Sequence, residues 1–219
     1  MNNGARDVFY RTRYFLLPYI IVLCGCLVIK FLYSRETIYF TVNSHYSDLA
    51  DIVMPYITYA GDGITVLLIA AALAILKSYR SGFLLASSYG VSSLVAQVLK
   101  YAFDMPRPGL YFQDQLSKIH LVKDLYILKV HSFPSGHTVT AFSAGIALTY
   151  LIQEKMWGLV LFAVAVLIGY SRMYLSQHFF EDVMAGSVVG AITTVLWIAF
   201  IDRKAFINSP LWCRGLLKK

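Results

Sequence analysis

Long apolar runs recur along this chain and constrain its fold more than any other feature. A helix needs roughly 20 mostly apolar residues to cross the hydrocarbon core of a bilayer. The chain is 58% hydrophobic and only 14% charged, whereas soluble domains carry about a quarter charged residues. Backbone polar groups in lipid are satisfied within helices or closed barrels. We therefore predict an all-α polytopic membrane protein, with residues 1–219 forming one bundle and one domain.

Six membrane spans are predicted from the apolar runs. They cover residues 14–33, 56–76, 82–103, 135–152, 156–170 and 180–201. The segment from Glu36 to Val53 mixes aromatic, aliphatic and acidic residues, which is typical of a short helix at the membrane interface. The connection from Asp104 to Phe133 is the longest in the chain and is interpreted as a functional loop.

The net charge of +7 comes from basic residues scattered at span ends and in loops. This distribution argues against nucleic acid as a partner and favours membrane topology with an anionic substrate. Lys and Arg are more frequent on the side of the two termini. The sequence therefore predicts cytoplasmic N- and C-termini and a site on the periplasmic side, in a bacterial inner (cytoplasmic) membrane.

Three polar motifs interrupt the apolar pattern. Lys100 and Arg107 end the third predicted span, Pro-Ser-Gly-His at 134–137 opens the fourth, and the segment 171–182 joins the fifth and sixth. An even number of crossings separates these places. All three motifs are therefore expected on the same membrane face, whatever the orientation.

The second motif is suited to an anion at a helix start. Pro134 stops a preceding helix, Ser135 is placed as an N-cap, and Gly136 leaves its N–H exposed because it lacks a Cβ. The other motifs add three cations at the membrane boundary, where isolated charges are costly. A phosphate dianion would neutralise them and would accept paired hydrogen bonds from arginine. The cations are Lys100, Arg107 and Arg172.

Histidines supply the reactive groups. His178 and Asp182 are four residues apart, a spacing that brings two side chains together on one face of a helix. A carboxylate on one ring nitrogen fixes the tautomer and leaves the other nitrogen as a nucleophile, while His137 is placed to act as a general acid. Because cations and helix N–H groups can stabilise phosphoryl transfer, no metal and no other cofactor is expected.

Each motif alone also fits a structural role: a buried ion pair, a helix cap or basic side chains that extend to the interface. Asp62 and Gly63 are interpreted as a helix start rather than as catalytic residues. For the charged residues of the long loop, substrate contact and a solvated surface both stay open; they are Lys118, His120, Lys123 and Lys129. Most tyrosines are interpreted as an interfacial belt, including Tyr10, Tyr14, Tyr19, Tyr33 and Tyr39.

Taken together, the three motifs resemble the signature of the type-2 phosphatidic acid phosphatase superfamily. They follow the pattern Lys-x6-Arg-Pro, Pro-Ser-Gly-His and Ser-Arg-x5-His-x3-Asp. The signature lies within residues 100–182, and the six-span layout resembles the membrane-bound lipid phosphatase branch. The resemblance implies a phosphohistidine at His178, oriented by Asp182, with His137 as the acid. It also implies phosphate binding by Lys100, Arg107, Ser135, Gly136 and Arg172.

The expected function is hydrolysis of a phosphomonoester or diphosphate on a membrane lipid. Candidate substrates are undecaprenyl diphosphate, lipid A phosphate, phosphatidylglycerol phosphate and phosphatidic acid. Two alternatives stay open: a phosphotransferase that uses a lipid acceptor, and a non-enzymatic protein that binds or transports an anion. The expected partners are the lipid substrate and membrane lipids, with no obligate protein partner. Lys118, Lys123 and Lys129 are possible substrate contacts. Their positive charge comes in addition to the three signature cations, which favours a lipid with two phosphates.

Overall fold

The computed structural model describes residues 4–123 and 125–217, and in this part of the chain the regular elements are all helical. The all-α membrane fold is therefore confirmed. The long and intermediate helices are α1 (Ala5–Leu32), α2 (Arg35–Ser44), α3 (Asp48–Tyr59), α4 (Gly63–Leu76), α5 (Tyr79–Phe103), α7 (Gly136–Leu151), α8 (Trp157–Tyr174) and α9 (Phe180–Ile201). The short ones are α6 (Pro108–Tyr111), η1 (Gln113–Lys118), η2 (Ala205–Asn208) and α10 (Pro210–Cys213).

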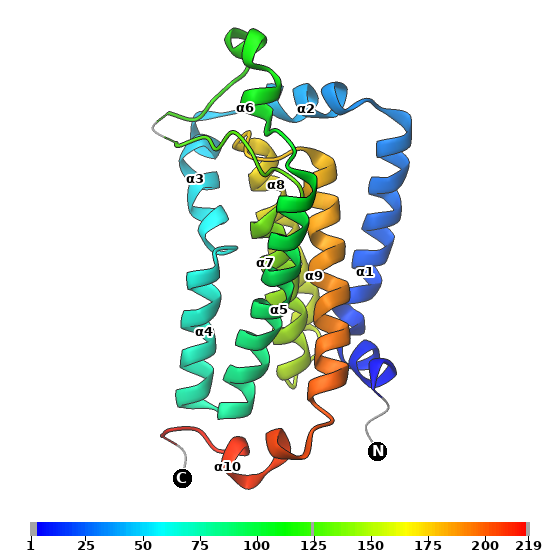
Figure 1. Ribbon diagram of the computed structural model, residues 1–219, viewed down its shortest axis with the longest axis vertical. Coiled ribbons are helices and arrows are strands. Elements are labelled where there is room, and N and C mark those ends of the chain that lie inside the picture. Colours follow the sequence, from blue (N-terminus) through cyan, green and yellow to red (C-terminus); the bar gives the residue numbers. More distant parts are fainter. Residues whose placement is uncertain (1–3, 124, 218–219) are drawn as a thin grey trace.

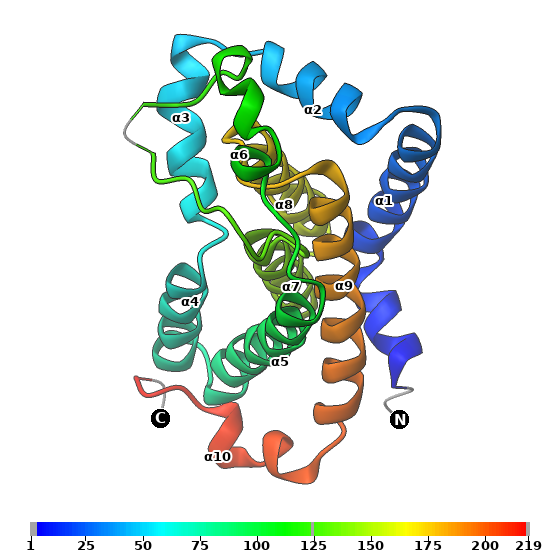
Figure 2. The same ribbon diagram turned by 45° about the horizontal axis from the view of Figure 1, so that its top comes forward.

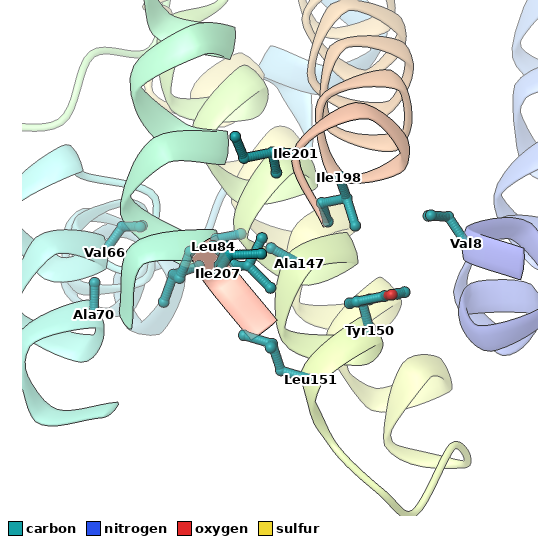
Figure 3. Close-up of a cluster of buried hydrophobic side chains, with 12 residues drawn as sticks. Val8, Val66, Ala70, Leu84, Ala147, Tyr150, Leu151, Ile198, Ile201 and Ile207 are labelled. Atoms are coloured by element: carbon teal, nitrogen blue, oxygen red, sulfur yellow. The ribbon is translucent and has the colours of Figure 1, made fainter. Parts of the chain in front are cut away.

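The bundle has two distinct ends (Figure 1). The 104–133 loop, α2 and α6 lie at one end, which we call the loop end. The start of α1 and the segment containing η2 and α10 lie at the other, which we call the terminal end. A cluster of buried apolar side chains from α1, α4, α5, α7, α9 and η2 fixes the terminal half of the bundle (Figure 3). The rigid core and the irregular loop are thus separated along the bundle.

Helix α7 lies at the centre, packed against α1, α5, α8 and α9 (Figure 2). Small residues permit the close packing of α9 against α7, because Gly186 and Gly190 lie one turn apart on the face of α9 that contacts α7. A Cβ at Gly190 would lie 2.5 Å from the carbonyl oxygen of Val139. One turn further along α9, the Thr194 hydroxyl donates to Ser143 Oγ at 2.7 Å. Close backbone approach and interhelical hydrogen bonds are typical of helix packing in membranes.

Within residues 4–123 and 125–217, four helical stretches are long and apolar enough to span a membrane: α1, Tyr79–Tyr111 (which begins with α5), α8 and α9. The pair α3 and α4 passes the same test together, with a bend of 52° at the break between them. The fourth predicted span corresponds to α7, which has 16 residues and is buried along most of its length. The count of six spans therefore stays a prediction.

The prediction of one interfacial helix over 36–53 is wrong. Two helices occupy this region, and α3 extends to Tyr59, into the span predicted for 56–76. The Ser47 side chain caps α3 by accepting from the N–H of Ala50. Asp62 caps α4 by accepting from the N–H of Ile64 at 2.8 Å, which confirms the helix start predicted there. Local capping therefore divides a run that is continuously apolar by composition.

The interfacial-belt interpretation is wrong for two of the tyrosines. Tyr19 and Tyr39 are only 7% and 5% exposed. The Tyr39 ring packs against Phe112 and Phe179, and its hydroxyl lies 2.9 Å from Ser176 Oγ. This aromatic cluster holds α2 and α6 against the segment that joins α8 to α9.

We predict that Gly190→Ala destabilises the protein, because the new methyl group would collide with the α7 backbone. Overpacking of this kind costs roughly 1–3 kcal/mol. Thermal unfolding in detergent should show a transition lowered by several degrees. The matched control is Gly90→Ala in α5, where a Cβ would meet nothing within 4 Å. Equal transition temperatures for both variants would contradict the close α7–α9 packing.

Candidate active site

The three motifs converge at the loop end, where α5, α7 and the α8–α9 connection meet. Arg107 Nη1 lies 3.2 Å from His178 Nε2, and the N–H of Ser135 donates to the carbonyl of Asp182 at 2.9 Å. A Cβ on Gly136 would lie 3.7 Å from Lys100 Cε. Residues that are far apart in the sequence therefore form one site.

His178 and Asp182 do meet, but not for the predicted reason. His178 precedes α9, whose N-cap is Phe179, so the two residues do not share a helical face. Asp182 is instead the third residue of the helix, and its Oδ2 accepts from the N–H of Phe179 at 2.9 Å. His178 Nδ1 lies 3.5 Å from the same Oδ2. The capping turn, rather than helical periodicity, brings the pair together.

Ser132 is a site residue that the sequence analysis missed. It is fully buried, and its hydroxyl donates to Asp182 Oδ2 at 2.5 Å while lying 3.5 Å from His178 Nδ1. Its place two residues before the Pro-Ser-Gly-His motif was the only available signal. The carboxylate of Asp182 is thus held by a backbone N–H and a hydroxyl, which fixes its direction toward the imidazole.

The arginine contact determines the tautomer of His178. A guanidinium has only donors, so His178 Nε2 must accept the hydrogen bond from Arg107, and Nδ1 carries the hydrogen that faces Asp182. Burial lowers the pKa of the His178 ring well below its ordinary value, and Arg107, Arg172 and Lys100 lower it further. The imidazole is therefore neutral, with the lone pair of Nε2 directed toward the buried cation.

Backbone carbonyls anchor Arg107 and Lys100. Arg107 Nε donates to the carbonyl of Val130 at 3.0 Å, and Nη1 donates to the carbonyl of Gln177 at 3.0 Å. Lys100 Nζ donates to the carbonyl of His131 at 2.8 Å. The returning half of the 104–133 loop therefore positions both cations.

Arg172 is the third cation of the site and is buried, with 7% of its surface exposed. Its Nη1 donates to Thr58 Oγ1 of α3 at 2.8 Å. Its Nε is buried and has no hydrogen-bond partner among residues 4–123 and 125–217. A buried guanidinium with a free donor is suited to an anionic ligand, because leaving such a donor unpaired is costly.

The N-terminal turn of α7 lies beside the cations, where the sequence predicts an anion site. Ser135 is the N-cap residue, as predicted, although its hydroxyl accepts from Thr138 Oγ1 at 2.9 Å instead of bonding a backbone N–H. Gly136 and His137 occupy the first turn, where backbone N–H groups lack carbonyl partners within the helix. A cavity of about 180 Å³ borders this turn between α4, α5 and α7. Its lining includes Lys100, Gly136 and His137 together with Asp62, Tyr89 and Gln97.

The loop lysines differ in their relation to this centre, because the carbonyl of Lys129 accepts from the N–H of Arg107 at 2.8 Å. Lys118, Lys123 and Lys129 are exposed, and Lys118 lines a polar hollow of about 450 Å³ beside α2. His120 stacks on Tyr46 with ring centroids 3.8 Å apart, and its Nε2 lies 2.9 Å from both carboxylate oxygens of Asp51. His120 therefore attaches the loop to the start of α3. Within the described ranges, no group of three or more His, Cys, Asp or Glu residues is arranged to hold a metal ion.

The chain is similar to several known proteins. The chain matches the PAP2 superfamily over residues 81–206. It is 26% identical over 212 residues to an undecaprenyl-diphosphatase of Sulfolobus acidocaldarius, covering 92% of this chain and 95% of that protein. It is 30% identical over 161 residues to the undecaprenyl-diphosphatase BcrC of Bacillus subtilis, covering 73% and 79%. Its fold matches the crystal structure of Aquifex aeolicus LpxE with a TM-score of 0.66 and 26% identity, covering 75% and 94%.

We predict that Ser132→Ala lowers turnover without unfolding the protein. Hydrogen bonds to charged groups contribute about 1.5–3 kcal/mol, so a drop in kcat of about 10- to 100-fold is expected. Phosphate release by the purified protein provides the measurement. The matched control is Ser88→Ala, because Ser88 is equally buried but makes no hydrogen bond among the described residues. Identical activity in both variants would argue against a role for Ser132 in holding Asp182.

Proposed function

This chain belongs to the PAP2 superfamily and is a membrane-bound lipid phosphatase, and we propose that it acts through a covalent phosphohistidine at His178. The observation that carries this proposal is the environment of the His178 ring. Nδ1 faces a fixed carboxylate, and the lone pair of Nε2 accepts from Arg107, a donor that phosphate oxygens would take over when substrate binds. A neutral imidazole of fixed tautomer, placed where phosphate oxygens would be neutralised, is suited to nucleophilic attack on phosphorus.

In the first step, Nε2 of His178 attacks phosphorus and the bond from phosphorus to the leaving oxygen breaks. The hydrogen on Nδ1 stays directed at Asp182, which stabilises the charge that develops on the ring. His137 donates its proton to the leaving oxygen, so that the lipid alcohol or lipid phosphate departs in its neutralised form.

In the second step, water attacks the phosphohistidine and the N–P bond breaks. His137, now neutral, accepts a proton from that water and returns to its starting state. Inorganic phosphate is released and His178 regains its lone pair. Lys100, Arg107 and Arg172 hold the phosphoryl oxygens throughout, together with the N-terminal turn of α7 that begins at Ser135 and Gly136. No metal or other cofactor takes part in this scheme.

For the substrate, we propose a diphosphate on a polyprenyl lipid. Two similar proteins carry the name undecaprenyl-diphosphatase, and the 104–133 loop presents basic side chains beyond the buried cations. One scissile phosphate is already matched by Lys100, Arg107 and Arg172. The second phosphate of such a lipid is a further anionic group at a distance from the scissile phosphate. Lys118, Lys123 and Lys129 would contact this group at the loop end.

We further propose that residues 1–219 act as one domain with the site facing away from the cytoplasm, in the inner membrane of a bacterium. The excess of Lys and Arg on the side of the termini supports this orientation. A cysteine placed at Ser117 should react with an impermeant reagent on intact cells, while one placed at Gln153 should not. The opposite labelling pattern would invert the orientation.

We predict that His178→Ala abolishes phosphate release from every lipid phosphate, because the nucleophile is lost. With a labelled substrate and rapid acid-free quenching, the wild-type protein should carry a base-stable, acid-labile phosphoryl group that the variant lacks. With a good leaving group, His137→Ala should still form the phosphoenzyme but hydrolyse it slowly, so that the label accumulates. Near wild-type activity of His178→Ala would disprove the mechanism.

We predict that the triple replacement of Lys118, Lys123 and Lys129 by Gln weakens cleavage of undecaprenyl diphosphate several-fold and barely alters cleavage of phosphatidic acid. Exposed ion pairs are individually weak, so the three changes are needed together. The comparison to make is kcat/KM on each lipid in matched micelles. The control replaces Arg6, Arg203 and Lys204 by Gln at the terminal end, which removes the same charge. Equal losses on both lipids, or none, would show that the loop lysines do not select the substrate.

A further inference from the structure

A second histidine–aspartate pair lies at the edge of the site. His137 Nε2 is 3.9 Å from Oδ2 of Asp62, a distance within ion-pair range but beyond a hydrogen bond. Asp62 comes from the break between α3 and α4, and both residues line the 180 Å³ cavity. Their side chains are 30% and 39% exposed, whereas those of His178 and Asp182 are 1% and 2% exposed.

Tight packing places the break against the start of α7. A Cβ on Gly61 would lie 2.5 Å from a methyl carbon of Ile168 and 3.1 Å from the carbonyl oxygen of His137. A Cβ on Gly63 would lie 1.9 Å from the hydroxyl of Tyr89. The two glycines therefore let the chain approach α7 and α5 closely, and Asp62 stands between them.

The orientation of the Asp62 carboxylate is also fixed. Its Oδ1 accepts from the N–H of Ile64 at 2.8 Å and caps α4, while Oδ2 faces His137. Capping alone does not require a charge, because asparagine and serine cap helices about as well as aspartate. A carboxylate within a predicted membrane span is costly, so the charge needs a second explanation.

The surroundings of His137 provide that explanation. Burial is the largest factor that disfavours a positive imidazole here, and Arg172 from α8, Arg107 from the loop and Lys100 from α5 disfavour it further. His178 is a further titratable group of the site, but it is buried and neutral. Asp62 from α4 is the acid that opposes these cations at the ring of His137, and an opposite charge at this distance favours the protonated form.

We propose that Asp62 is a positioning residue that orients His137 and stabilises its protonated form for proton donation to the leaving oxygen. This inference rests on the proposed function, in which His137 is the general acid. The proton moves only between His137 and the leaving oxygen, and later from water back to His137. Asp62 stays ionised throughout and touches neither the phosphorus nor the leaving group.

The decisive variant is Asp62→Asn, which removes the charge and keeps an oxygen to cap α4. We expect the rate of phosphoenzyme formation in a single turnover to fall about tenfold on short-chain phosphatidic acid, whose alkoxide is a poor leaving group, and to change little on p-nitrophenyl phosphate. The alkaline limit of the kcat/KM profile should move about one pH unit lower, because the acid loses its proton more readily. The unfolding temperature should stay the same, and Asp62→Glu should recover part of the activity.

Two controls isolate the effect. Asp114→Asn removes an equal charge from an exposed position of η1 and should leave both the rate and the pH profile unchanged. Adding Asp62→Asn to His137→Ala should cost nothing further, because a residue that acts through His137 has no effect once that ring is gone.

Unchanged kinetics in Asp62→Asn would overturn the inference and leave Asp62 as a helix cap. Equal losses on both substrates with a lowered unfolding temperature would do the same, since they indicate a structural role. Both outcomes leave the proposed function intact, because the wild-type protein would still release phosphate. A wild-type protein that releases no phosphate from any lipid phosphate would instead overturn the proposed function and this inference with it.

Discussion

Burial of two arginines beside one buried histidine is the constraint on which the rest of the site depends. Water cannot solvate Arg107 or Arg172, which are 5% and 7% exposed, so the protein must supply their partners. Carbonyls of the 104–133 loop satisfy Arg107, and Thr58 of α3 satisfies part of Arg172. The loop and the broken span are therefore structural requirements of the cation cluster. Nε of Arg172 is buried and has no hydrogen-bond partner among the described residues, so an anion that accepts from it would remove a costly unpaired donor.

The centre of the bundle makes this arrangement rigid. Gly186 and Gly190 allow α9 to approach α7 closely, and a Cβ on Gly186 would lie 2.7 Å from the carbonyl oxygen of Ser135. The start of α7 is thus packed directly against the helix that carries Asp182. Under the proposed mechanism, the N–H groups and the carboxylate need little reorganisation when phosphate arrives, and such preorganisation is a major source of catalysis.

Sequence reasoning succeeded where one physical rule dominates. The apolar runs gave the membrane fold, and the parity of crossings placed the three motifs on one face. It failed where tertiary contacts decide the local structure. A hydropathy average does not detect the break between α3 and α4. This break depends on the helix cap provided by Asp62 and on the close packing of Gly61 against α7. Spacing suggested that His178 and Asp182 share a helical turn, but α9 begins at Phe180, after its N-cap Phe179, so His178 lies outside the helix. No pattern marks the hydrogen bond from Ser132, because a single serine has no periodicity.

The two histidine–aspartate pairs differ mainly in burial, and burial accounts for the different tasks proposed for them. His178 is enclosed by Arg107 and Asp182, so its ring is held neutral and the lone pair of Nε2 points at the cation that would bind phosphate. His137 borders a cavity, where a partly exposed carboxylate opposes the cations that act against a positive ring. The break between α3 and α4 therefore belongs to the chemistry as much as to the fold, because it brings a carboxylate to the second histidine.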